Sequence, residues 1–431
     1  MLVNRSRMVR ALGVAAAAAL ALSACGGDSG GPASASDGEG GDVTLRFTWW
    51  GSDTRHQATQ EIIDAFEDAN PGITINPEYG DWGGYWDKLA TQVASNDAPD
   101  IIQMDEKYLR EYADRGALLD LSDVETGAMT DATVATGRTE EGLFGIPTGI
   151  NAMALMANPD IFAAAGLELP DDTTWTWDDY ADIAKQVDDG SEFYGATGPN
   201  EPATFQIWLR QQGKEMTTED GQLGFEVSDA QEYLDLMLDL RERGALPEAS
   251  ILSEDQSPGP DQSLTGTGQV AMGAWWTNQL AALSTAAGTD LVPLRFPSSD
   301  GSEGGAQLFY KSSMYMSGNA RTQHPEEVKK FIDFMVNSEE AGKINLADRG
   351  LPANLEVRDV VLGELDEADT RGAEFLADIE DELGDPMAVP PLGFSTMQEA
   401  IYRYELEVWF GRQSTADAAQ QLYNEMESAI G

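Results

Sequence analysis

The stretch Val43-Thr44-Leu45-Arg46-Phe47-Thr48-Trp49-Trp50-Gly51 begins the folded part of the chain. Apolar and polar residues alternate from Val43 to Phe47, which predicts a β-strand with one buried face. The paired tryptophans and Gly51 then end the strand and predict a loop. Because neighbouring strand residues point to opposite faces, only one of the two tryptophans is expected in the core behind the sheet.

Helix and strand signals alternate after this first strand. A helix is predicted over 56–69, which stops at Asn70-Pro71-Gly72. The next segments are a strand over 73–75, a helix over 85–94, a strand over 98–102 and a helix over 108–116. This order predicts an α/β fold whose sheet has helices on both faces. Sheets of this kind bind ligands in the crevice at the carboxyl ends of their strands.

The pattern changes at three later points, namely at Gly145-Ile146-Pro147-Thr148-Gly149, at Gln307 and at Gly350-Leu351-Pro352. Between the first two points a second alternating half predicts strands over 152–156, 269–274 and 291–294, and helices over 176–187, 204–211, 230–243 and 278–283. Later segments predict a strand over 311–316 and helices over 325–336, 395–410 and 415–430. A chain of 431 residues exceeds what one hydrophobic core usually serves, so two domains are expected.

Charge excludes two classes of partner. The chain has 75 acidic and 26 basic residues, for a formal net charge of −49. No basic face is visible for phosphate contacts, so we expect no nucleic-acid partner and no loose binding to anionic lipid. The acidity is typical of a solvating surface and does not by itself identify a ligand.

The N-terminus reads as an export signal with a lipid site. Three arginines precede an apolar run from Ala11 to Leu22, which is too short for a permanent membrane span. The ending Leu22-Ser23-Ala24-Cys25 resembles a bacterial lipoprotein processing site, so residues 1–24 are a predicted signal peptide and Cys25 the predicted lipid attachment site. Residues 25–42 form a predicted flexible linker. The alternative is an ordinary signal peptide with an incidental cysteine.

Six passages in order along the chain resemble the extracellular sugar-binding lipoproteins of ABC importers, solute-binding family 1, which includes maltose-binding protein. They are Thr48–His56, Ala98–Asp105, Gly145–Asn151, Ala271–Asn278, His324–Val328 and Asp348–Asn354. The resemblance implies a two-lobed periplasmic-binding-protein-like fold, with two α/β domains joined by hinge crossings. It places residues 43–147 and 308–352 in an N-terminal lobe, and residues 148–307 and 353–431 in a C-terminal lobe.

The resemblance also implies a function. A monomer on the outer face of the cytoplasmic membrane, lipid-anchored through Cys25, would capture a carbohydrate, expected to be an oligosaccharide, between its lobes. It would deliver the sugar to membrane permease subunits that a separate ATPase drives. No enzyme activity, cofactor or metal is expected, and the chain contains no His-Glu-x-x-His motif.

Sugars present apolar ring faces and polar edges, so a site needs aromatic surfaces together with hydrogen-bonding side chains. The expected ligand-binding residues are Trp50, Asp53, Arg55, Asp105, Asn151, Phe205, Trp276, Asn278 and Lys311. Each has a structural alternative, such as core packing for the aromatic residues, helix capping for Asp53 and a solvated strand end for Lys311. Trp82 and Trp86 are expected to form a packed helix face.

Two other functions stay open. A secreted glycoside hydrolase would place a pair of the abundant carboxylates at a cleft, which the composition does not refute. A protein of the same fold for a non-sugar or a uronate would use Arg55, His56 and Lys311 to pair with an acidic ligand.

Overall fold

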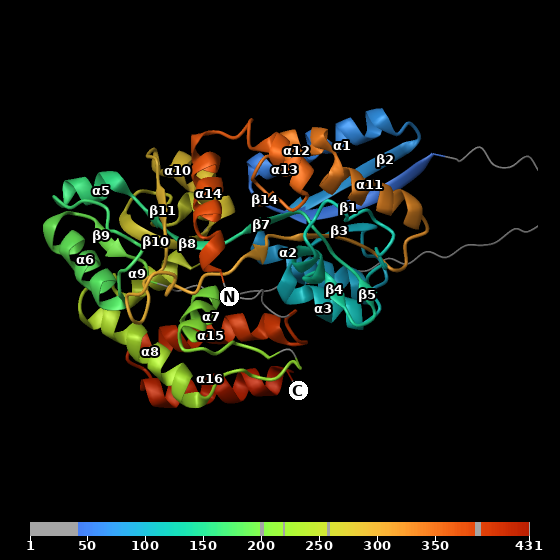
Figure 1. The fold of residues 1–431 in the computed structure, drawn as a ribbon. Helices are drawn as coiled ribbons and strands as arrows, with labels where there is room; N and C mark the ends of the chain where they lie inside the picture. The colour runs from blue at the N-terminus through green and yellow to red at the C-terminus, as the bar shows by residue number, and fades with distance from the viewer. Residues whose placement is uncertain (1–41, 199–201, 219, 257–258, 384–388, 431) are drawn as a thin grey trace, which may run out of the picture. The chain divides into compact units, whose positions relative to one another are not determined.

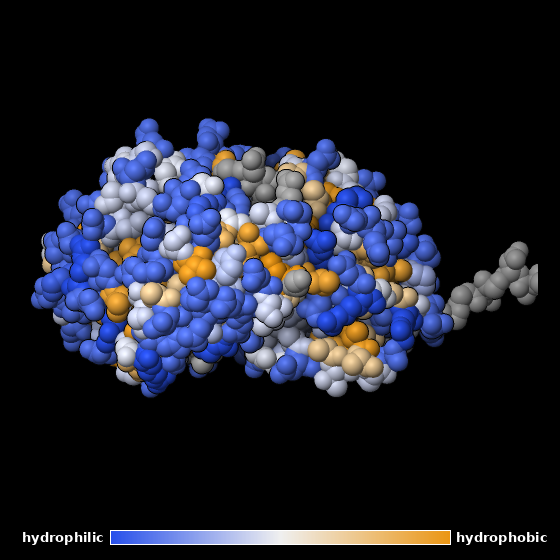
Figure 2. All heavy atoms as spheres, turned by 90° about the horizontal axis from the view of Figure 1, so that it is seen from below, coloured by the Kyte–Doolittle hydropathy of each residue, from blue (hydrophilic) through white to orange (hydrophobic). Residues whose placement is uncertain are grey.

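The computed structural model describes residues 42–198, 202–218, 220–256, 259–383 and 389–430 (Figure 1). The predicted signal peptide, Cys25 and all of the linker except residue 42 lie outside the described residues. No helix in the described ranges combines the length and the apolar character that crossing a bilayer requires. On the face shown in Figure 2, hydrophilic residues dominate and hydrophobic ones form small patches, which agrees with a solvating role for the charge.

The first lobe is built on a five-stranded sheet in the order β2-β1-β3-β13-β6. The strands are β1 (Val43–Trp50), β2 (Ile73–Gly80), β3 (Ile101–Met104), β13 (Tyr315–Gly318) and β6 (Ile146–Pro147). Its helices are α1 (Asp53–Ala69), α2 (Trp82–Ala94), α3 (Glu106–Asp114), α4 (Asp131–Ala135), α11 (Pro325–Asn337), α12 (Glu339–Asn345) and α13 (Leu355–Val361), beside a small hairpin of β4 (Arg138–Thr139) and β5 (Gly142–Leu143). β1 pairs in parallel with β2 and β3, whereas β13 is antiparallel to β3 and β6.

The paired tryptophans divide between the two faces of this sheet. Trp49 is fully buried in a core that includes residues of α1 and α11, such as Phe66 and Phe331. Trp50 belongs to a separate core with Tyr85 of α2 and residues of α3. The two side chains point to opposite faces as predicted, and both faces carry helices as expected for an α/β sheet. The expectation that only one of them is buried is wrong, because the helices on each face cover both.

The second lobe is built on a four-stranded sheet in the order β11-β8-β10-β9. The strands are β8 (Met153–Ala157), β9 (Tyr194–Ala196), β10 (Val270–Trp276) and β11 (Val292–Leu294). Around them lie α5 (Pro159–Ala164), α6 (Trp177–Gly190), α7 (Pro202–Gln211), α8 (Val227–Glu242), α9 (Ala249–Asp255), α10 (Leu280–Ala287), α14 (Glu367–Asp378), α15 (Phe394–Trp409) and α16 (Thr415–Ile430). Three short 3₁₀ turns occur at η1 (Pro260–Gln262), η2 (Thr277–Gln279) and η3 (Glu380–Glu382).

A third, small sheet joins segments from distant parts of the sequence. Its order is β12-β7-β14, with β12 (Lys311–Ser312), β7 (Gly149–Asn151) and β14 (Leu351–Pro352). A Cβ atom on Gly149 would come within 2.6 Å of the Arg349 carbonyl oxygen, so only glycine fits where β7 meets β14. Gly350 has φ +83°, a left-handed conformation that also favours glycine. We call these three strands the crossing strands.

Element boundaries differ from the sequence pattern where a cap decides them. The helix predicted from residue 56 begins at Asp53, because the Ser52 hydroxyl accepts a hydrogen bond from the backbone N–H of Arg55. The strand predicted over 98–102 lies at 101–104. Helices α4, α9, α12, α13 and α14 have no counterpart among the predicted segments. All but α14 span only five to seven residues, which are too few to show a helical period.

Phe205 of α7 is fully buried within the core of the second lobe. Its ring contacts Tyr233 at 4.7 Å and Phe225 at 5.2 Å between centroids. Substituting Phe205→Ala is therefore expected to lower the free energy of unfolding by about 3–5 kcal/mol, because it leaves a cavity among these rings. Urea denaturation measures this loss.

Phe205→Leu is the matched control, since it keeps most of the apolar volume and should cost clearly less. If Phe205→Ala unfolded at the same urea concentration as the unsubstituted protein, the packing role would be wrong.

Candidate functional site

A chain of polar contacts connects the two lobes beside the crossing strands. Arg55 Nε donates to Asp348 Oδ2 at 2.5 Å, and Arg55 Nη2 donates to the Asp348 carbonyl at 2.7 Å. That carbonyl also accepts from Asn278 Nδ2 at 3.2 Å, and Asn278 Oδ1 accepts from Asn151 Nδ2 at 2.8 Å. Three of the expected ligand residues, Arg55, Asn151 and Asn278, therefore meet through Asp348. The buried Oδ1 of Asn151 has no hydrogen-bond partner within the described ranges.

A buried ion cluster lies on β12. Lys311 Nζ pairs with Asp105 Oδ2 at 3.1 Å and with Glu106 Oε1 at 3.2 Å, both at the start of α3. The ammonium also lies 4.9 Å from the centroid of the Trp276 ring at the end of β10. Three further expected residues, Asp105, Trp276 and Lys311, are thus brought together, and the missed residue Glu106 joins them.

The ionisation of this cluster follows from burial and mutual attraction. Burial alone would lower the pKa of Lys311, but the facing carboxylates of Asp105 and Glu106 raise it above its ordinary value. Burial would raise the pKa of Asp105, but Lys311 and Lys107 outweigh it and lower that pKa. For Glu106, burial dominates and the pKa is raised. The cluster contains one cation and two carboxyl groups, so the charge of the Lys311 ammonium is balanced within the protein.

The remaining expected residues belong to neither the Asp348 contacts nor the Lys311 cluster. Trp50 is 7 % exposed, and its ring contacts those of Trp82, Tyr85 and Trp86. Asp53 is the exposed first residue of α1 and joins neither polar group. Phe205 lies in the core described above, away from these contacts. Trp82 and Trp86 pack with Trp50 as expected of a helix face, although Trp82 remains 39 % exposed.

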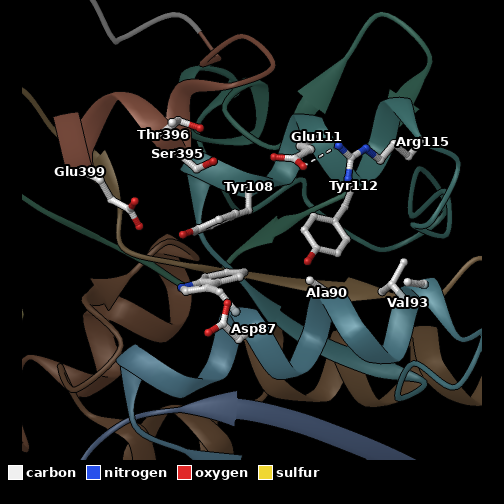
Figure 3. Close-up of a pocket in the computed structure, with 12 residues that line it drawn as sticks. Asp87, Ala90, Val93, Tyr108, Glu111, Tyr112, Arg115, Ser395, Thr396 and Glu399 are labelled. Atoms are coloured by element: carbon white, nitrogen blue, oxygen red, sulfur yellow. Dashed lines mark ion pairs between the residues drawn. The ribbon is translucent and has the colours of Figure 1, made fainter. Parts of the chain in front are cut away.

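A cavity of about 420 Å³ opens between helices of both lobes (Figure 3). We call it the interlobe cavity. Its lining comes from α2, α3 and the start of α15: Trp86, Asp87, Ala90, Val93, Ala94, Tyr108, Glu111, Tyr112, Arg115, Ser395, Thr396 and Glu399. Helix α15 contacts α3 directly, so the two lobes meet at this wall.

One wall of the interlobe cavity is aromatic. The rings of Trp86 and Tyr108 stack with centroids 3.7 Å apart and planes inclined by 18°. Tyr112 continues this wall along α3, one helical turn after Tyr108. Burial raises the pKa of Tyr112 to about 12, so its hydroxyl stays protonated at neutral pH. The wall offers apolar faces and protonated hydroxyl groups, a combination that suits a ring-shaped polar ligand.

Sequence reasoning did not select the residues of this wall. Tyr108, Glu111, Tyr112 and Arg115 follow each other at helical spacing and form one face of α3, which reads as ordinary amphipathic packing. Glu399 lies on α15 in the other lobe. The signal that could have found the α3 residues is the mixture of two tyrosines with charged groups on one helix face.

Comparison with known proteins gives a family match over most of the chain. The family described as "Bacterial extracellular solute-binding protein" matches residues 50–342. A putative ABC transporter periplasmic-binding protein of Escherichia coli K12 is 24 % identical over 324 residues, which cover 71 % of this chain and 70 % of that protein. An uncharacterized lipoprotein of Streptomyces antibioticus is 30 % identical over 225 residues, 49 % of this chain and 46 % of the relative, so that match spans about half of each.

Solved structures agree on the architecture. A periplasmic oligogalacturonide binding protein from Yersinia enterocolitica, in complex with saturated digalacturonic acid, has a TM-score of 0.80. The comparison covers 90 % of this chain and 100 % of that one at 20 % identity. At this identity the likeness shows the fold, which is the two-lobed one implied by the sequence resemblance.

Removing the Lys311 cation should reveal the free-energy cost of burying two carboxylates without a counter-charge. In Lys311→Met, Asp105 and Glu106 would be buried without their cation, and stability at neutral pH is expected to fall by about 3–5 kcal/mol. Both carboxyl groups would then have raised pKa values, so the loss is full above those values and shrinks as the pH falls toward about 4. Thermal unfolding across this pH range measures the loss.

The triple variant Asp105→Asn, Glu106→Gln and Lys311→Met removes all the charges together and should recover much of the loss. A Lys311→Met deficit that was independent of pH would contradict this account.

Proposed function

Because the chain belongs to the bacterial extracellular solute-binding protein family, we propose that it captures a carbohydrate outside the cell for an ABC importer. It delivers the ligand, expected to be an oligosaccharide, to permease subunits in the membrane, and a separate ATPase drives uptake. On this proposal the protein is a monomer without catalytic activity. A lipid on Cys25 holds it at the outer face of the cytoplasmic membrane, and the signal-like start of the chain supports that anchor.

The observation that supports this function most is the interlobe cavity. Its lining comes from α2 and α3 of one lobe and α15 of the other, and its stacked Trp86–Tyr108 wall suits sugar ring faces. Beside the crossing strands, Asn151, Asn278 and Trp276 supply amide and aromatic groups at the meeting point of the lobes. The buried Asn151 Oδ1 has no hydrogen-bond partner within the described ranges, and on this proposal it accepts from a ligand hydroxyl when the lobes open.

Closure is the proposed mechanism. On this proposal the chain passes between the lobes near residues 147/148, 307/308 and 352/353, where the crossing strands β7, β12 and β14 lie. Helix α13, which follows the third of these crossings, still packs against α12 of the first lobe. Bending there changes the width of the interlobe cavity, as in hinged ligand-binding proteins. A sugar shifts the balance toward the closed form only by its greater affinity for that form. The permease then recognises the closed arrangement.

The uronate and hydrolase alternatives have less support. The cations proposed for a uronate are engaged: Arg55 pairs with Asp348, Lys311 pairs with Asp105 and Glu106, and His56 Nδ1 accepts from Trp49 Nε1 at 3.0 Å. An acidic ligand would have to displace these partners. A hydrolase would release products, which the experiment below detects.

Trp276→Ala is expected to weaken binding of a matching oligosaccharide by about tenfold or more, because it removes the stacking surface nearest the crossing strands. A thermal-shift screen against neutral, basic and acidic saccharides first identifies a ligand. Calorimetry then compares the variant with the unsubstituted protein, and chromatography of the recovered ligand tests for turnover.

Phe410→Ala is the matched control, because Phe410 is an exposed aromatic residue beyond the far end of α15. It should leave the affinity unchanged. Equal affinity of the Trp276 variant would remove Trp276 from the site, and a chemically altered ligand would favour the hydrolase.

A further inference from the structure

We propose that the saccharide held in the interlobe cavity carries a positive charge, such as a protonated amino group on a sugar ring. This inference rests on the function proposed above and narrows it to one class of substrate.

Two carboxylates of the lining have no ion-pair partner in the part of the chain that the structure describes. Asp87 comes from α2 of the first lobe and Glu399 from α15 of the second. In Figure 3 the carboxylate of Glu399 lies near the hydroxyl end of Tyr108. After burial, the charge of Asp105 and then that of Glu399 are what raise the pKa of Tyr108 above its ordinary value. The cavity thus has a negative group on each lobe.

The basic groups nearby are already paired. Arg115, the base among the lining residues, donates to Glu111 at 2.8 Å, a pair drawn as a dashed line in Figure 3. Lys311 is held between two carboxyl groups, and Arg55 pairs with Asp348. Lys107 lies 5.4 Å from the Trp82 ring and does not line the cavity. A cationic ligand therefore meets carboxylates that have no ion-pair partner. An anionic ligand meets basic groups that are already paired.

The aromatic wall adds a second, independent reason. Organic ammonium groups are attracted to the faces of tryptophan and tyrosine rings within about 6 Å. Trp86, Tyr108 and Tyr112 line the cavity with the ring surface that the Trp86–Tyr108 stack leaves uncovered. Trp86 lines the cavity and is only 8 % exposed. Rings combined with carboxylates form an environment in which an ammonium on a sugar gains contacts that a hydroxyl does not. The overall charge of −49 also favours the approach of a cation.

The test uses saccharides that differ in one group only. One series contains β-1,4 oligomers of glucosamine, N-acetylglucosamine and glucose. The other contains α-1,4 oligomers of galactosamine, galactose and galacturonic acid. Within the series that binds, calorimetry is expected to show the amine form binding about tenfold more tightly than the hydroxyl form. This advantage should shrink as salt is raised, because the contributing charges are partly exposed.

Charge-removing variants locate the effect. Glu399→Gln and Asp87→Asn keep the shape of each side chain, and each is expected to reduce the amine preference by about three- to fivefold. Affinity for the neutral saccharide should change little. Glu192→Gln is the matched control, since Glu192 is exposed in the second lobe and does not line the cavity.

The outcomes separate the two proposals. If a neutral or acidic saccharide binds as tightly as its amine counterpart, or if the Asp87 and Glu399 variants keep the full preference, the charge inference is overturned and the carbohydrate function stands. If no saccharide of any charge binds, the carbohydrate function fails as well.

Discussion

The buried pairing of Lys311 with Asp105 and Glu106 is the interaction on which the site depends. Lys311 lies on a crossing strand, its carboxylate partners begin α3, and its ammonium faces the Trp276 ring of the second lobe. Three structural parts therefore meet at one cation. Burial makes the arrangement costly unless every partner is in place. Asp105 also caps α3, because its Oδ1 accepts from the backbone N–H of Lys107 at 3.1 Å. The position of α3 in turn determines where the Tyr108 wall faces the second lobe.

A second buried cation, Arg349, stabilises the neighbouring segment that leads into the crossing strand β14. Arg349 is fully buried and donates to Gln103 Oε1 at 2.9 Å, to Asn345 Oδ1 at 2.9 Å and to Thr59 Oγ1 at 2.6 Å. Burial, and then the charge of Arg55, lowers the pKa of Arg349 to about 9, which leaves the guanidinium protonated at neutral pH. Neutral oxygen acceptors alone satisfy its hydrogen bonds. It ties β3 and α1 to the segment that enters β14, next to the Asp348 contact.

The sequence predicts the architecture better than the site. Alternating apolar residues, adjacent tryptophans and glycine-containing breaks are local signals, and they anticipated the sheets, their helices and the opposed faces of Trp49 and Trp50. The boundaries of α1 depended on a cap at Ser52, which the apolar period does not report. The same local reasoning placed Asn151, Asn278 and Lys311 near the lobe junction, because strand ends converge there. It did not foresee the wall from Tyr108 to Arg115, because helical spacing alone does not tell an unpartnered face from a packed one. Nor did it foresee that Glu399 would face that wall, since contacts between segments so far apart depend on how the lobes meet.

Gly149 has a consequence for how such a protein diversifies. Where β7 meets β14 the backbones are so close that a methyl group would collide with the carbonyl of Arg349. The joint is consequently defined by main-chain geometry and leaves almost no room for variation. The cavity-lining surfaces of α3 and α15 carry no such restriction, so substitutions there can alter which solute is bound while this joint is inherited unchanged. In this way related chains can acquire new ligands without any change at the joint between β7 and β14.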